Sequence, residues 1–424
     1  MANQLQAIRG MHDILPADAP VWHQLEGQYQ QLVESYGYRE IRTPLVEKTA
    51  LFARSIGEAT DIVEKEMYSF DDRNGDSLSL RPECTASVVR AGLQAGLLHD
   101  QQQRWWYCGP MFRHERPQKG RYRQFYQFGA EIFGIAGADI EAELILLAAR
   151  FWKRLGLSDI ELHINSLGSS ACRQAYRARL VEYLSDHFAD LDEDSQRRLE
   201  TNPLRILDSK NPEMQTLIEA APALHDSLDE ASLAHFQQLR DILDQTEVEY
   251  QVNQRLVRGL DYYSHTVFEW ITDTLGSQGT VCGGGRYDGL IEQLGGKPGH
   301  AAGFSMGCER LIAMLVDQGK AESGTRPSIY FSMRGDNSVA RAQQLAEALR
   351  DRQPQLKIIV HAGEGSFKSQ MRKADKSGAR IALILGEAEM ETGTIAIKYL
   401  REDIPQEKVP QVDLTARIEA IFKQ

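Results

Sequence analysis

The chain has 424 residues, 42% of them hydrophobic, which suits two or three soluble globular domains. No apolar run reaches the length of a membrane span, and the N-terminus lacks the apolar core of a secretory signal, so we expect a cytoplasmic protein outside the membrane. The net charge of −12 excludes a surface that attracts nucleic acid everywhere, and the five cysteines, without a CxxC pair, argue against a disulfide framework or a structural zinc site.

The first hundred residues alternate between helix and strand patterns. Residues 20–36 have the spacing of an amphipathic helix that ends at Gly37. The segment YGYREIRTPLVE then predicts a strand interrupted by Pro44. A turn rich in glycine and acidic residues, 71–78, separates two short apolar strands, and residues 86–98 predict a helix.

The next segment predicts a long antiparallel hairpin. Two aromatic-rich strands, RWWYCGPMFR and RQFYQFGAEIFG, flank a loop in which basic residues greatly outnumber acids. Residues 140–156 predict a helix with acids early and bases late, as the helix dipole favours. Residues from about 170 to 250 are polar and helix-prone, which indicates a mostly helical insertion.

Strand patterns return at residues 251–270 and near 279–282, followed by GGGRYDGL. Gly303 and Gly307 are expected to introduce a helix that runs to about Gln318. The string GGGRYDGL lacks the glycine spacing of a dinucleotide-binding loop, and the sequence contains no P-loop motif.

The segment AESGTRP, residues 321–327, predicts a domain boundary. Beyond it, residues 326–424 alternate apolar strands with polar helices and carry a small excess of Lys and Arg over Asp and Glu. This pattern predicts a small α/β domain with a mixed, largely parallel sheet.

Three arginines far apart in the sequence stand beside glycine or aromatic residues: Arg113, Arg258 and Arg310. They suggest one site that holds the phosphates of a nucleotide. In the hairpin, Phe125 can stack on a purine, while Glu115 accepts from its exocyclic amine. Two alternatives remain open for single motifs: an exposed, salt-bridged hairpin, and in RGLDYY a buried ion pair between Arg258 and its neighbouring Asp.

Taken together, these strings resemble a known family. FRHERPQKGRYRQF resembles motif 2 of class II aminoacyl-tRNA synthetases, GFSMGCERL resembles motif 3, and YREIRTPLVE is similar to motif 1, the dimer-forming strand. LVRGLDYYSHTVFEW and GGGRYDGL resemble the two signatures of histidyl-tRNA synthetases. The resemblance implies an α+β catalytic domain built on an antiparallel sheet, residues 1–325, an anticodon-binding domain, 326–424, and a homodimer.

The activity implied by the resemblance is the ligation of L-histidine to tRNA(His). ATP, with Mg²⁺, converts histidine to histidyl-adenylate, which is then transferred to the 3′ end of the tRNA. Charge develops on the α-phosphate and the leaving group, so preorganised cations are the main catalytic resource, here Arg113 and Arg258. The residues implied in ATP binding are Arg113, Glu115, Arg121, Phe125 and Arg310.

The resemblance also implies a histidine pocket and an RNA-binding surface. A carboxylate and a phenol that pair with both ring nitrogens give large discrimination without an editing site. The implied histidine-binding residues are Glu83, Thr85, Arg113, Gln127, Glu131, Arg258, Tyr262 and Tyr263. The implied contacts to the tRNA acceptor stem are Arg116, Lys119 and Arg123, with a further basic cluster at Lys368, Arg372, Lys373 and Lys376.

Two departures and one alternative remain. Cys84 stands where the family usually has glycine, so a requirement for positive φ would strain this loop. Cys308 replaces a residue that is commonly leucine. A non-catalytic, histidine-binding regulatory paralogue of a biosynthetic enzyme is the alternative function, but such paralogues typically lose the phosphate-binding arginines and the anticodon domain.

Overall fold

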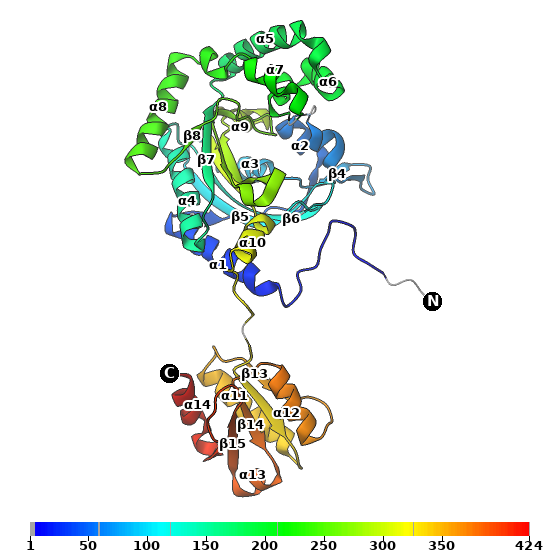
Figure 1. The fold of residues 1–424 in the computed structure, drawn as a ribbon, viewed down its shortest axis with the longest axis vertical. Helices are drawn as coiled ribbons and strands as arrows, with labels where there is room; N and C mark the ends of the chain where they lie inside the picture. The colour runs from blue at the N-terminus through cyan, green and yellow to red at the C-terminus, as the bar shows by residue number, and fades with distance from the viewer. Residues whose placement is uncertain (1–4, 58–59, 119, 210, 325, 424) are drawn as a thin grey trace. The chain divides into compact units, whose positions relative to one another are not determined.

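The computed structural model describes residues 5–57, 60–118, 120–209, 211–324 and 326–423 (Figure 1). The described chain divides into two compact units, residues 1–322 and 323–424. The division falls within the segment 321–327 that the sequence marks as a linker. Each unit has its own sheet and its own hydrophobic core.

In the described part of the first unit, eight strands form one sheet in the order β1-β5-β6-β11-β10-β9-β7-β8. Neighbouring strands are antiparallel except at the two edges, where β1 pairs with β5 and β7 with β8 in parallel. This confirms an α+β domain built on a mainly antiparallel sheet. The strands are β1 Arg39–Glu40, β5 Gln103–Phe112, β6 Gln124–Phe133, β7 Glu161–Ser166, β8 Gln251–Val252, β9 Ser264–Ile271, β10 Thr280–Arg286 and β11 Ala301–Gly307.

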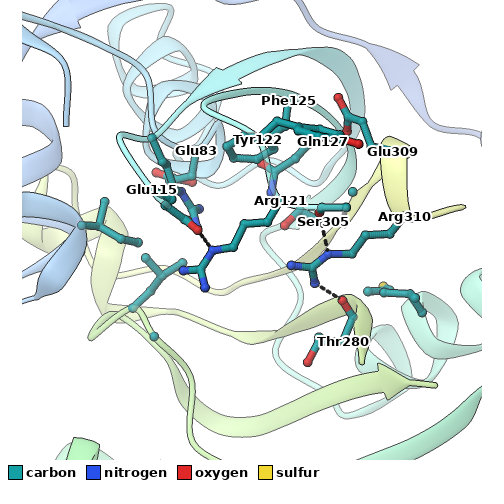
Figure 2. Close-up of a pocket in the computed structure, with 18 of the residues that line it drawn as sticks. Glu83, Glu115, Arg121, Tyr122, Phe125, Gln127, Thr280, Ser305, Glu309 and Arg310 are labelled. Atoms are coloured by element: carbon teal, nitrogen blue, oxygen red, sulfur yellow. Dashed lines mark hydrogen bonds and ion pairs between the residues drawn. The ribbon is translucent and has the colours of Figure 1, made fainter. Parts of the chain in front are cut away.

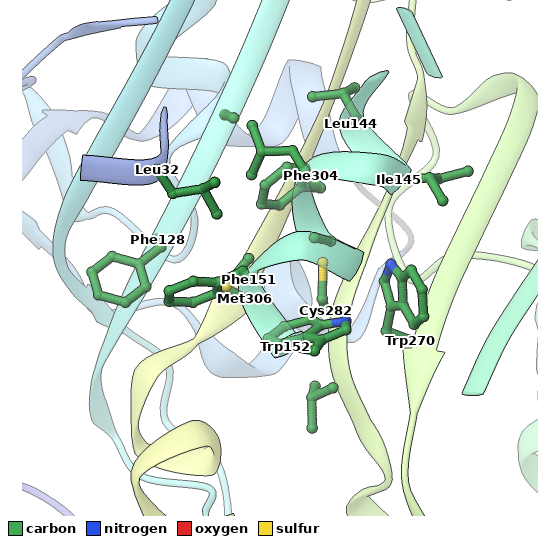
Figure 3. Packing of buried hydrophobic residues seen from close by; sticks show 14 of the residues in the cluster. Leu32, Phe128, Leu144, Ile145, Phe151, Trp152, Trp270, Cys282, Phe304 and Met306 are labelled. Carbon is green, nitrogen blue, oxygen red and sulfur yellow. The ribbon is translucent and has the colours of Figure 1, made fainter. Parts of the chain in front are cut away.

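Four helices of the described chain, α1 Ala19–Ser35, α4 Asp139–Leu155, α8 Glu230–Gln245 and α10 Cys308–Asp317, share a hydrophobic core with this sheet. Figure 3 shows Phe151 and Trp152 of α4 packed among Phe128 and other side chains of the strands. The predicted charge pattern of α4 is present, with acids in its first turn and bases in its last.

Pro44 separates two strands that belong to different sheets rather than one interrupted strand. β1 joins the large sheet, whereas β2 Val46–Lys48 pairs with β4 Ser77–Leu80 in a small sheet that β3 Ser69–Asp71 completes. The predicted turn at 71–78 connects β3 and β4. Helices α2 Thr49–Ile56, α3 Thr85–Gln94 and α9 Gly289–Gln293 pack near one another.

The predicted insertion is helical, as expected. Its α-helices are α5 Ser170–Asp186, α6 Glu193–Thr201, α7 Gln215–Ala220 and α8 Glu230–Gln245, joined by short 3₁₀ turns. Side chains cap three of them: Ser169, Asp192 and Asp229 accept from backbone N–H groups in the first turns of α5, α6 and α8.

The glycine-rich region after the insertion differs from the prediction. The segment 251–270 is not continuous strand, because residues 253–263 form an irregular loop between β8 and β9. β10 continues through the glycines to Arg286, and Gly303 lies inside strand β11 rather than before a helix. Close approach explains both glycines: a Cβ on Gly283 would overlap the guanidinium of Arg258, and one on Gly303 would overlap the carboxylate of Glu131.

The second unit has a sheet of five described strands in the order β13-β12-β14-β15-β16. The first three are parallel and the last two pairs are antiparallel, so the sheet is mixed. Strand β16 and the short helix α13 are absent from the predicted pattern. The elements are β12 Ile329–Met333, α11 Ser338–Arg352, β13 Ile358–Val360, α12 Phe367–Lys376, β14 Ile381–Leu385, α13 Glu387–Thr392, β15 Thr394–Tyr399, β16 Glu407–Pro410 and α14 Leu414–Phe422.

Candidate active site

A cavity of about 240 Å³ opens over the large sheet and brings together most of the residues singled out in the sequence. The three distant arginines, Arg113, Arg258 and Arg310, all line it. Figure 2 shows Arg121 beside Glu115 and Arg310 beside Thr280 among the side chains that line it. The other predicted residues in its lining are Glu83, Thr85, Glu115, Arg121, Phe125, Gln127 and Tyr262.

Arg113 follows the end of β5 and is fixed by three contacts. Its Nε donates to the carbonyl oxygen of Pro82 at 2.8 Å, and its guanidinium carbon lies 5.4 Å from the centre of the Phe125 ring. Its Nη1 is 3.9 Å from Oε1 of Glu115. Burial lowers the pKa of Arg113, because the charged form loses hydration that these contacts replace only in part.

Glu115 and Arg121 form an ion pair across the loop of the hairpin (Figure 2). Glu115 is buried, while Arg121 also has Oε1 of Glu66 within 3.9 Å of its Nη2. Burial lowers the pKa of Arg121 as well. An anionic group of a ligand in the cavity can therefore replace Glu115 as the partner of Arg121.

Arg258 forms an ion pair with Glu269 of β9 rather than with the neighbouring Asp261, so the predicted alternative of a buried Arg258–Asp261 pair is wrong. Oγ1 of Thr280 donates to the other oxygen of Glu269 at 2.9 Å. Burial opposes the charge of Arg258, but the carboxylate of Glu269 outweighs it and raises the pKa of Arg258 above its ordinary value.

Arg310 occupies the first turn of α10, where the helix dipole already favours an anion. Its Nε donates to the carbonyl oxygen of Gly120 at 3.2 Å, and its Nη1 donates to that of Thr280. Burial, followed by repulsion from Arg121 and Arg113, lowers the pKa of Arg310 to about 10. Three guanidinium groups thus repel one another in one cavity, which favours a polyanion as ligand.

Glu309 was not predicted as a site residue, although the sequence shows an acid–arginine pair there. Both its carboxylate oxygens accept from the backbone N–H of Tyr126, at 2.9 and 3.1 Å. Its side chain lines the cavity, and burial raises its pKa to about 7.

A second group of polar residues lies at the inner end of the cavity. The carboxylate of Glu83 accepts from the N–H groups of Thr85 and Ala86, at 2.6 and 3.0 Å, at the start of α3. Burial raises the pKa of Glu83. Gln127 presents a buried amide oxygen that has no partner within the described chain. These groups suit the α-amino group of an amino acid.

Glu131 lies behind Thr85 and is completely buried. It accepts from Oγ1 of Thr85 at 2.7 Å and from the hydroxyl of Tyr287. Burial raises the pKa of Glu131 to about 8 despite these hydrogen bonds. Tyr287 was not predicted as a site residue, although it is the tyrosine of GGGRYDGL.

Two tyrosines complete this inner pocket. The rings of Tyr262 and Tyr263 lie 4.7 Å apart, and Tyr262 lies 5.6 Å from Tyr287. Tyr263 is buried beneath Arg258, with 5.6 Å between the guanidinium carbon and the ring centre. A ligand that entered this pocket would meet phenols and the buried carboxyl groups of Glu83 and Glu131.

Cys84 adopts φ of −111°, so the loop before α3 has no need of the glycine that is usual in the family. The predicted strain is therefore absent. Burial raises the pKa of the Cys84 thiol to about 12, which leaves little reactive thiolate. Cys308 is also completely buried.

The basic residues predicted for RNA contact lie away from the inner pocket. Arg116 is exposed in the hairpin loop, whereas the Nε of Arg123 donates to the carbonyl oxygen of Glu115 at 3.2 Å. Lys119 lies outside the described residues. In the second unit the exposed basic residues of α12 are Lys368, Arg372, Lys373 and Lys376.

Within the described residues, no helix is long and apolar enough to cross a membrane, and no group of three acidic, histidine or cysteine side chains could hold a metal ion.

Comparisons with known proteins agree with this arrangement. A family model described as histidyl-tRNA synthetase matches residues 10–311, and one described as an anticodon binding domain matches residues 329–421. A histidine–tRNA ligase of Hydrogenovibrio crunogenus is 58% identical over 97% of this chain and 96% of its own length. One from Halorhodospira halophila is 55% identical over 100% of both chains. The crystal structure of the apo histidyl-tRNA synthetase of S. aureus matches with a TM-score of 0.82 and 34% identity, over 98% of this chain and 100% of that one. The chain therefore belongs to the histidyl-tRNA synthetase family.

Proposed function

We propose that the chain is a histidine–tRNA ligase, which activates L-histidine with ATP and transfers it to the 3′ end of tRNA(His). The observation that carries this proposal is the meeting of Arg113, Arg258 and Arg310 in one cavity, beside a pocket of phenols and buried carboxyl groups. Family membership supports the same activity.

In the activation step, the carboxylate of histidine attacks the α-phosphorus of ATP and pyrophosphate leaves. Arg258 and Arg113, which both line the cavity, would stabilise the charge that develops on the α-phosphate and hold the attacking carboxylate. Phe125 and Glu115 would hold the adenine. Arg121 and Arg310 would hold the γ-phosphate, whose charge replaces the internal pairing of Arg121 with Glu115.

In the histidine pocket, Glu83, Thr85 and Gln127 would receive the α-amino group, and Glu131 and Tyr263 would contact the imidazole. Tyr262 forms the wall between the two regions. Tyr287 holds Glu131 in place by its hydrogen bond. The substrate ring nitrogens would then satisfy polar groups that an analogue without them leaves unpaired.

Mg²⁺ is part of this proposal. Mg²⁺ is usually bound through one or two carboxylates together with the phosphates of its substrate, so a protein cluster of three ligands is not required. Glu309 is the carboxyl group that lines the cavity next to Arg310, and it would hold the ion. The ion would share the negative charge of the phosphates.

We extend the proposal to RNA contact, cellular location and oligomeric state. Arg116, Lys119 and Arg123 would contact the acceptor stem, and α12 of the second unit would contact the anticodon arm. The protein would act in the cytoplasm. It would be a homodimer, for which the supporting feature is β1, the motif 1 strand at the edge of the large sheet; sedimentation equilibrium at micromolar concentration tests this.

The activity is tested by ATP–pyrophosphate exchange with each of the twenty amino acids. We expect exchange with histidine and background rates with the others. Exchange with a different amino acid, or with none, would contradict the proposed function. Charging of tRNA(His) but not of an unrelated tRNA then tests the second step.

A further inference from the structure

The loop of residues 253–263 carries Arg258, Tyr262 and Tyr263 but contains no helix or strand. Contacts with neighbouring elements must therefore fix its position. On the side of the catalytic domain, Arg258 pairs with Glu269, and the N–H of Asp261 donates to the carbonyl oxygen of Ile56 at 3.2 Å.

Strand β7 contacts the start of the loop, where the N–H of Asn253 donates to the carbonyl oxygen of Ile164 at 3.0 Å. The helical insertion contacts its other end, which carries Tyr262 and Tyr263. Arg173 of α5 donates through Nη1 to the carbonyl oxygens of Asp261, at 3.2 Å, and of Tyr263. Asn202, directly after α6, donates through Nδ2 to Oδ1 of Asp261 at 2.9 Å. The two insertion residues thus hold one side chain and two carbonyl groups of the loop.

Both hydrogen-bond acceptors of the half-buried Arg173 are backbone carbonyls of the loop. Burial lowers the pKa of Arg173, and Asp261 only partly opposes this effect. The planar guanidinium directs its hydrogen bonds in a fixed geometry, so these two bonds also set the path of the loop backbone at Asp261 and Tyr263.

We propose that Arg173 and Asn202 are positioning residues, through which the helical insertion sets the geometry of the histidine pocket. The inference rests on the proposed function, since it takes Arg258, Tyr262 and Tyr263 as histidine-binding groups. The residues assigned to the adenine and the γ-phosphate belong to other elements: Phe125 lies on β6 and Arg310 on α10. Loss of the positioning contacts therefore affects histidine use more than ATP use.

The first experiment compares Arg173→Met with Arg177→Met in the full-length protein. Arg177 lies one turn further along the same helix and donates to the carbonyl oxygen of Glu200, within the insertion, at 3.1 Å. In ATP–pyrophosphate exchange, Arg173→Met is expected to lower kcat/KM for histidine about tenfold or more and to change KM for ATP less than about twofold. Arg177→Met should resemble the parent in both. Equal losses for the two substrates, or no loss, would overturn the inference.

The second experiment tests the hydrogen bond between Asn202 and Asp261 by exchanging its amide and its carboxylate. Asn202→Asp sets two carboxylates against each other where a 2.9 Å hydrogen bond now lies. We expect it to raise KM for histidine, and we expect addition of Asp261→Asn to restore much of the parent value. A double variant no better than Asn202→Asp would contradict a positioning role for this hydrogen bond.

The third measurement does not depend on activity. Hydrogen–deuterium exchange of peptides that cover residues 253–263 should be faster in Arg173→Met than in Arg177→Met, with similar thermal unfolding of the two variants. Unchanged exchange would overturn the positioning role. Faster exchange in a protein whose parent form activates no histidine would instead retain the positioning role and contradict the proposed function.

Discussion

The contacts of Arg258 fix its guanidinium in advance, as a catalytic cation requires. Glu269 forms an ion pair with it, and the hydroxyl of Thr280 donates a hydrogen bond to Glu269. Arg258→Ala should slow adenylate formation by an amount equivalent to about 2–4 kcal/mol of barrier, the range found for loss of a preorganised electrostatic group. Single-turnover formation of the adenylate, measured by rapid quench with saturating ATP and histidine, checks this.

The substitution also leaves the carboxylate of Glu269 without its ion-pair partner, so stability must be followed in parallel. Thermal unfolding of Arg258→Ala and of Glu269→Gln separates a fold defect from a catalytic one. A folded Arg258→Ala protein with the single-turnover rate of the parent would remove Arg258 from the mechanism.

Glu131 makes the stability of the protein depend on pH. Its pKa rises from an ordinary value of 4.5 to about 8 on folding, because burial disfavours the ionised carboxylate. The stability associated with the protonated form is therefore fully present below pH 4.5 and is lost as the pH rises through about 8. Glu131→Gln cannot ionise, so between pH 5.5 and 9 it should lose less stability than the parent, by a few kcal/mol at about 1.4 kcal/mol per pKa unit.

Urea unfolding of both proteins at the two pH values measures this difference. Other buried acids, such as Glu309 with a pKa of about 7, titrate in the same window but contribute to both proteins. Their effects cancel in the comparison. Parallel stability curves for parent and variant would show that Glu131 is already ionised in the folded protein near neutral pH.

Sequence motifs predicted the residues that line the cavity better than the residues that support them. Arg113, Arg258 and Arg310 are recognisable because arginines beside glycines and aromatics form dense local patterns. Glu269 and Tyr287 lie within the two strings that resemble the family's signatures, but neither string shows that they support Arg258 and Glu131. Their roles arise from strand pairing that joins distant segments, which local patterns do not encode.

At the scale of whole elements, the hairpin β5–β6 was predicted because its aromatic residues alternate and a basic loop joins the strands. The sequence predicted only the start of β10 and did not predict β11, because the glycines of both strands weaken strand propensity. Those glycines leave space for Arg258 and Glu131, so the features that hid the strands also form the site.

A buried ion pair joins three elements behind the site. Glu141 of α4 accepts from Nε and Nη2 of Arg286 at 2.9 and 2.7 Å, and His235 of α8 lies 2.7 Å from the same carboxylate. Arg286 is 1% exposed and Glu141 0%. Glu141→Gln should therefore cost about 3–5 kcal/mol of unfolding free energy, because the buried guanidinium loses its completely buried countercharge and keeps the contact with the partly exposed Asp288, at 3.2 Å from Nη1. Urea unfolding at neutral pH measures the loss.

The same helix supplies a matched control. Glu143 pairs with Arg104 at 3.1 Å, but both side chains are about 30% exposed to solvent. Glu143→Gln should cost less than about 1 kcal/mol, as is usual for exposed pairs. Equal costs for the two substitutions would mean that burial does not strengthen the Glu141–Arg286 contact.

For the whole molecule, the two units have separate cores. The core of the second unit is formed by residues of its own strands and helices, such as Phe331, Leu383 and Ile418. All the residues that line the active-site cavity lie between Ile62 and Arg310. The residues assigned to the activation step thus lie in the first unit, and those assigned to the anticodon contact lie in the second. A deletion can therefore test the two roles separately.

Deletion of residues 326–424 should therefore spare histidine-dependent pyrophosphate exchange and impair tRNA charging. Exchange should stay within a few-fold of the parent, whereas kcat/KM for tRNA(His) should fall about 100-fold or more, the scale on which a second binding module contributes to avidity. Circular dichroism and a cooperative unfolding transition establish that the fragment is folded. If that folded fragment lost exchange as completely as charging, the second unit would have to act on the activation step itself, and the division of labour between the units would be wrong.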